Sequence, residues 1–134
     1  MTDTFTFELV SPEKLLVSKP AVMVTVPGSE GEYGVLPMHA AMITTLKPGV
    51  IQIYEEDTTT PNERIFVAGG FAEVTSSRFT VLATEATPVA NLNRPALQEE
   101  AKALATQITS AEDAALEALQ VQQEIVAAKI DAAA

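Results

Sequence analysis

The sequence predicts an antiparallel β-sandwich followed by an antiparallel two-helix hairpin. Up to about residue 86, short runs rich in Val, Ile, Thr and Phe alternate with Gly and Pro at intervals of roughly 8–12 residues, which is typical of sandwiches and barrels. Beyond Thr87 and Pro88, alanine dominates and apolar residues recur at helical spacing. A chain of 134 residues is long enough to bury a core. We expect the sandwich over residues 1–87 and the hairpin over residues 88–134.

The first strand is the clearest, because residues 4–9 alternate polar and apolar side chains. The connections are too short for crossover helices, so we do not expect a parallel α/β sheet. The glycines of residues 28–34 predict a tight connection between strands, and Gly69 with Gly70 predicts a turn or bulge. Further strands are predicted over residues 21–26, 49–54, 63–68, 71–75 and 78–83.

The start of the first helix has a clear local signal. Asn93 is a suitable N-cap, and Pro95 falls in the first turn, where a missing N–H costs little. The apolar residues that follow at helical spacing are Leu97, Ala101, Leu104 and Ile108.

A second helix is predicted to restart at Ser110, which forms a capping box with Asp113. With a connection of about two residues, the helices must run antiparallel. An alanine-rich seam buries little apolar area, so the hairpin is a candidate mobile element. The expected seam of the second helix is Ala114, Ala118, Val121, Ile125 and Ala128.

Composition excludes several function classes. The chain has no cysteine and one histidine, which rules out disulfides and multi-histidine or cysteine metal sites. Eight basic residues stand against 18 acidic ones, a net charge of −10, so nucleic acid and anionic lipid would be repelled on average. The opening MTDTFTFELV has no secretory signal, and no apolar run is long enough to span a membrane, so we expect no membrane insertion.

No group of residues predicts catalysis. His39 has no triad partner nearby, and a structural or interface role is preferred for it. The glycine-rich residues 28–34 lack the spacing and the lysine of a phosphate loop. The acidic residues 55–57 adjoin a polar stretch that predicts an exposed hairpin loop. We therefore expect no catalytic residue, no cofactor and no metal.

The segments VPGSEGEYGVLPMHAAMITTLKPGVIQI and FVAGGFAEV together resemble the epsilon subunit of rotary, proton-translocating ATP synthases. The resemblance implies a non-catalytic sandwich at the foot of the central stalk. There it would bind the gamma subunit, rest on the membrane c-ring and help to transmit torque during ATP synthesis. By position in the motif, it implies that Glu32, Tyr33 and His39 are interface residues. The absence of an import sequence favours a bacterial source, or a plastid-encoded chain, over a nuclear-encoded mitochondrial one. We expect a peripheral location on the cytoplasmic face of a bacterial inner membrane.

The resemblance also bears on the tail. Some bacterial members inhibit ATP hydrolysis when the hairpin extends towards the alpha and beta catalytic subunits, helped by basic residues. From residue 91 onward this chain has three cations and seven acids, a net of −4, which implies weak or absent inhibition. Some members bind ATP through an Asp-x-x-Arg motif, and here Asn93 and Ala96 replace the acid and the arginine. Arg94 is the remaining candidate in a degenerate nucleotide site, and the alternative function is a free-standing ATP-sensing module.

Overall fold

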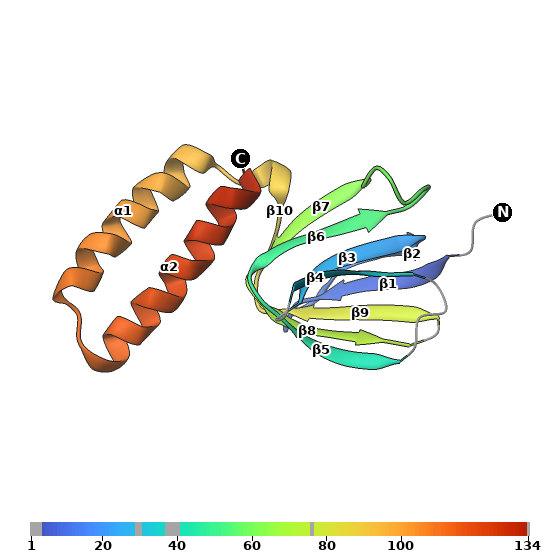
Figure 1. The fold of residues 1–134 in the computed structure, drawn as a ribbon, viewed down its shortest axis with the longest axis horizontal. Coiled ribbons are helices and arrows are strands. Elements are labelled where there is room, and N and C mark those ends of the chain that lie inside the picture. Colours follow the sequence, from blue (N-terminus) through green and yellow to red (C-terminus); the bar gives the residue numbers. More distant parts are fainter. Residues whose placement is uncertain (1–3, 29–30, 37–40, 76, 134) are drawn as a thin grey trace. The chain divides into compact units, whose positions relative to one another are not determined.

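The computed structural model describes residues 4–28, 31–36, 41–75 and 77–133 of the 134. The chain divides into two compact units, Met1–Pro88 and Val89–Ala134. The first is built of strands and the second of helices (Figure 1), so the predicted fold class is confirmed. Within the described residues, no helix is both long and apolar enough to span a membrane.

Ten strands form the β unit within the described residues. They curl into a two-layered half-barrel (Figure 1). The strands are β1 (Phe5–Val10), β2 (Leu15–Ala21), β3 (Met23–Gly28), β4 (Gly31–Val35), β5 (Met42–Leu46), β6 (Gly49–Tyr54), β7 (Glu63–Val67), β8 (Gly70–Val74), β9 (Arg78–Ala83) and β10 (Ala86–Pro88).

The sheet follows the order β10-β7-β6-β3-β5-β8-β9-β1-β2, and β4 pairs with β3 beside this path. Among the described strands the pairing is antiparallel except between β1 and β9, which run parallel. This one departure from the predicted antiparallel sheet places the first strand of the chain next to the last long strand. Local sequence patterns do not predict a pairing between strands so far apart in the chain.

The core of the β unit follows from strand alternation. In β1, Phe5, Phe7 and Leu9 are buried while the residues between them are exposed or half-buried. Phe79 on β9 stacks on Phe5 at a centroid distance of 6.3 Å and meets Phe7 edge-on at 5.8 Å. These aromatic contacts in the core stabilise the parallel pairing of β1 with β9.

Four strands were not predicted, and their sequences show why. β2 contains Pro20 and is mostly exposed, which an edge strand tolerates but a pattern search discounts. β4 contains Gly31 and Gly34. The tight connection predicted over residues 28–34 is therefore wrong in extent, because Gly28 ends β3 and β4 begins at Gly31. The other two unpredicted strands are β5 and β10.

The helical unit contains a short 3₁₀ turn, η1 (Val89–Asn91), followed by α1 (Arg94–Ser110) and α2 (Asp113–Ala133). The predicted start of α1 is confirmed, since Asn93 Oδ1 accepts a hydrogen bond from the Ala96 N–H at 3.1 Å. Three of the four residues of the predicted face lie in the hairpin core, since Leu97 and Leu104 are buried and Ala101 packs against them. The fourth, Ile108, is half-buried outside this cluster.

Two predictions for α2 are wrong. Ser110 is the last residue of α1 and its hydroxyl donates to the Gln107 carbonyl, so it caps no second helix. Three residues expected in the seam, Ala114, Ala118 and Val121, are exposed, Val121 by 57%. The other two, Ile125 and Ala128, are half-buried. The residues that pack in the hairpin core are Leu119, Val126 and Ile130, because these larger side chains bury more apolar area than the alanines.

Candidate interaction site at the β4–β5 cavity

Strand β4 carries two of the predicted site residues on opposite faces. It pairs antiparallel with β3, so that Tyr33 lies opposite Val26 and Glu32 opposite Pro27. Because successive residues of a strand point to opposite sides, Tyr33 shares the inward side with buried Val26, and Glu32 is exposed.

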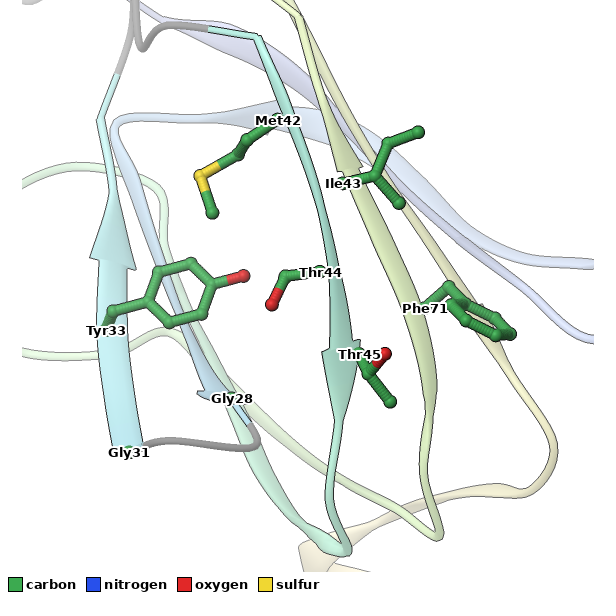
Figure 2. Close-up of a pocket in the computed structure, with 8 residues that line it drawn as sticks. All are labelled: Gly28, Gly31, Tyr33, Met42, Ile43, Thr44, Thr45 and Phe71. Atoms are coloured by element: carbon green, nitrogen blue, oxygen red, sulfur yellow. The ribbon is translucent and has the colours of Figure 1, made fainter.

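A cavity of about 460 Å³ lies between β4 and β5, and we call it the β4–β5 cavity. It forms because β3 pairs with β4 over five residues but with β5 only where Gly28 meets Leu46. Figure 2 shows Tyr33 and Thr44 pointing towards each other from the two sides. The lining residues are Gly28, Gly31, Tyr33, Met42, Ile43, Thr44, Thr45 and Phe71.

Gly28 makes room for the Tyr33 ring. A Cβ atom at position 28 would lie 2.7 Å from Cε1 of Tyr33, closer than side-chain atoms approach. The Tyr33 ring therefore occupies space that is free only because position 28 has no side chain.

The Tyr33 hydroxyl is buried, yet it has no hydrogen-bond partner among the described residues. Burial raises the pKa of this phenol, and the facing Thr44 hydroxyl partly offsets that increase. The Thr44 side chain faces the Tyr33 hydroxyl across the cavity (Figure 2). A buried hydroxyl left unpaired is destabilising, so this arrangement needs an explanation.

The outer face of the sheet beside the β4–β5 cavity carries exposed apolar side chains (Figure 2). Ile43 is 74% exposed and Phe71 is 55% exposed. Phe71 pairs in register with Leu82 of β9, which is 46% exposed, so the apolar surface continues across the sheet. Exposed apolar patches of this kind mark interaction surfaces.

Comparison with known proteins identifies the family. Residues 4–89 match the family described as ATP synthase, Delta/Epsilon chain, beta-sandwich domain. The ATP synthase epsilon chain of Rhodospirillum centenum is 56% identical over 109 residues, which are 81% of this chain and 72% of that one. The epsilon chain of Rhodospirillum rubrum is 44% identical over 133 residues, covering 99% and 98% of the two chains. The chain belongs to the ATP synthase epsilon chain family. This confirms the predicted family and its role as a non-catalytic subunit.

Solved structures agree with the epsilon fold. A chain of the Euglena gracilis mitochondrial ATP synthase (OSCP/F1/c-ring) has a TM-score of 0.81 at 22% identity, covering 93% of this chain and 78% of that one. A chain of the Tetrahymena thermophila mitochondrial ATP synthase (central stalk/c-ring) has a TM-score of 0.73 at 13% identity, covering 99% and 98%. At these identities the likeness concerns the fold.

Of the predicted site residues, only Tyr33 lines the β4–β5 cavity. Glu32 and Tyr33 lie next to each other on β4, with only Tyr33 in the β4–β5 cavity. His39 lies outside the described residues. Arg94 is the exposed first residue of α1, in the helical unit. Within the described residues, no group of three or more acidic or histidine side chains is arranged to hold a metal ion.

Sequence reasoning missed most residues of the β4–β5 cavity. Met42, Ile43 and Thr44 belong to β5, a strand that was not predicted, although their alternation of half-buried and exposed residues is regular. Phe71 lies on a predicted strand, but its exposure depends on what covers the outer face of the sheet. Residues 42–46 read Met-Ile-Thr-Thr-Leu, in which polar and apolar side chains do not alternate, so a period-two search does not find β5.

Proposed function

We propose that this epsilon chain is the rotor subunit that couples the gamma subunit to the c-ring of a proton-driven ATP synthase. The observation that carries the proposal is the match to the Rhodospirillum rubrum epsilon chain, which is 44% identical over nearly the whole of both chains. The proposed location is peripheral, on the cytoplasmic face of a bacterial inner membrane. Glu32, Tyr33 and His39 are the proposed interface residues.

Affinity capture of the full chain from the assembled synthase tests this proposal. We expect a gamma subunit to be recovered with it. A photoreactive cross-linker on Glu32→Cys should reach the c-ring, and the same linker on Glu56→Cys, in the exposed loop after β6, serves as the matched control. Failure to recover gamma from an intact complex would reject the proposal.

We further propose that the helical unit inhibits ATP hydrolysis weakly or not at all. Its three cations and seven acids disfavour docking against an acidic segment of the alpha and beta subunits. Hydrolysis should therefore change less than about twofold when residues 91–134 are removed from the reconstituted complex. A large activation on truncation would contradict this part of the proposal.

Nucleotide sensing through Arg94 is the alternative function. The side chain of Asn93, which stands where some relatives have an acid, is occupied as the N-cap of α1. Pro95 fixes the backbone on the other side of Arg94. We therefore expect no measurable heat when the full chain is titrated with ATP and Mg²⁺. Appreciable heat that disappears in Arg94→Ala would favour the sensing module.

A further inference from the structure

We propose that the gamma subunit docks on an apolar row across the outer face of the sheet, with Phe71 as its anchor and Glu73 as the residue that selects a basic side chain of gamma. This inference rests on the proposed function, which supplies the partner. It adds a contact surface separate from Glu32, Tyr33 and His39, and it states the chemistry that gamma must offer there.

The row crosses neighbouring strands through residues that pair in register. Leu82 on β9 lies opposite Phe71 on β8 and beside Val10 on β1. Val10 in turn lies opposite Leu15 on β2, and Ile43 on β5 lies diagonal to Phe71. We call these five residues the outer apolar row. Adjacent strands are about 4.8 Å apart, so a row across five strands spans about 19 Å, enough for an extended contact with a partner.

The outer apolar row is exposed although the same strands bury a core on their other side. Leu15 is 54% exposed, a value close to that of Phe71, and Figure 2 shows Ile43 and Phe71 pointing away from the β4–β5 cavity. The residues that alternate with the row, such as Leu9 and Val81, are buried. Outward positions on a sheet with one solvated face are normally polar, so a continuous apolar row there marks an interaction surface.

A carboxylate borders the row beside its anchor. Glu73 lies two residues from Phe71 on the same face and pairs in register with Ile43. The acid on the next strand but one, Glu8, already forms an ion pair with Arg78, whose Nε lies 3.2 Å from Oε1 of Glu8. Because Glu73 is exposed, a base from a partner can pair with it without either charge being buried. The partner that fits this surface therefore presents apolar side chains flanked by a lysine or an arginine.

Charge and position favour gamma over the other occupants. A second copy of this chain has the same net charge of −10, and a twofold contact would place the same acidic patch on both sides. The proposed c-ring contact is at Glu32 on β4, which among the described strands pairs only with β3 and so lies outside the row. Of the two proposed partners, gamma is the one left for this surface. Permanently assembled subunits also meet through more apolar interfaces than transient partners do.

Phe71→Ala is the decisive variant. The affinity of the full-length chain for its own gamma subunit should fall at least about tenfold, as for truncation of an aromatic anchor at the centre of an interface. Leu36→Ala is the matched control, because Leu36 is 50% exposed but follows β4 outside the row. Its affinity for gamma should stay within about twofold of wild type. Urea unfolding establishes that each variant is folded, and Leu82→Ala takes the place of Phe71→Ala should that variant not fold.

Glu73→Lys tests the charge of the gamma side chain. Affinity should fall about tenfold at low ionic strength and by a smaller factor at high salt, because the pair is exposed to screening. Glu56→Lys makes the same change of net charge in the exposed loop after β6 and should leave the affinity unchanged. Equal affinities of these two variants for gamma would overturn the assignment of a basic group.

The outcomes separate this inference from the proposed function. If Phe71→Ala binds gamma as tightly as wild type, or if Leu36→Ala alone weakens binding, gamma docks elsewhere and the inference is wrong while the proposed function stands. If the free wild-type chain sediments as a dimer that Phe71→Ala dissociates, the row joins two copies and the inference is again wrong. If the wild-type chain does not bind gamma at all, the proposed function fails.

Discussion

Position 70 has no room for a side chain, and its backbone conformation favours glycine. Its φ is +146°, a region that L-residues rarely adopt. A Cβ atom there would lie 2.0 Å from the carbonyl oxygen of Leu82 on the neighbouring strand. The backbone of β8 can pair closely with β9 at this point only because position 70 has no side chain.

Gly70→Ala should therefore lower the free energy of unfolding by about 2–4 kcal/mol through strain and steric overlap. Gly34→Ala is the matched control, since its new Cβ would meet Met23 Sδ at an ordinary 3.5 Å. That variant should change stability by less than about 1 kcal/mol. Urea denaturation followed by circular dichroism measures both, and a Gly70→Ala protein as stable as Gly34→Ala would contradict the argument.

At this scale, sequence reasoning succeeds where the cause is local. Gly69 and Gly70 were predicted to form a turn or bulge, and both have positive φ. The buried hydroxyl of Tyr33 was not foreseeable in this way. It depends on β3 and β5 separating beyond the single pairing of Gly28 with Leu46, which is a property of the assembled sheet.

Among the elements, α1 was predictable and α2 only in part. Asn93 and Pro95 mark the start of α1 by local hydrogen bonding and fixed φ. The packed face of α2 could not be read reliably, because alanine is compatible with a buried or an exposed position. In the structure, Leu119 and Val126 pack in the hairpin core, whereas the predicted Val121 is exposed.

The N-cap of α1 gives a test at the scale of one element. Asn93→Ala removes the acceptor of the Ala96 N–H and should destabilise the helical unit by about 1 kcal/mol. Hydrogen exchange at the first turns of α1 should accelerate by the corresponding factor. Asn91→Ala, in the preceding 3₁₀ turn, is the control and should leave this exchange unchanged. Equal exchange in the two variants would show that the cap contributes nothing.

An ion pair joins two strands that do not pair through their backbones among the described residues. Lys19 on β2 contacts Glu63 on β7, and its Nζ lies 3.7 Å from an oxygen of Glu55. The hydrogen bond to Glu63 raises the pKa of the Lys19 ammonium above its usual value, against an opposing effect of burial. The side chains are partly exposed, so the pair contributes about 1 kcal/mol or less.

The sign of the pH dependence follows from the raised pKa. Stabilisation by Lys19 is complete below the pKa of lysine in the unfolded chain, about 10.4, and is lost as pH rises through the higher folded value. Lys19→Met should lower the unfolding free energy by about 1 kcal/mol or less at pH 7, and the difference from wild type should shrink above pH ~11. Lys14→Met, at an exposed position, is the control. A difference that grows with alkaline pH would contradict the assignment.

For the whole molecule, the two units differ in how much core they bury. Among the described residues, the main cluster of the β unit has 17 buried residues, whereas that of the hairpin has three fully buried ones, Leu97, Leu104 and Val126. Hydrophobic stabilisation grows with buried apolar area, so the helical unit should open at a lower free energy than the strands. This contrast was visible in the sequence as the change from Val, Ile and Phe to Ala, because burial capacity is set by composition.

Native-state hydrogen exchange should therefore resolve two sets of amides, with those of α1 and α2 exchanging at a lower opening free energy than those of β1 and β9. Leu104→Ala should lower the helical set by about 2 kcal/mol and leave the strands unchanged, and Val81→Ala should do the reverse. These two variants are matched controls for each other, because each removes buried apolar atoms from one core only. If either substitution lowers the opening free energy of both sets equally, the chain opens as one cooperative unit, and the hairpin cannot move independently of the sandwich in the rotor.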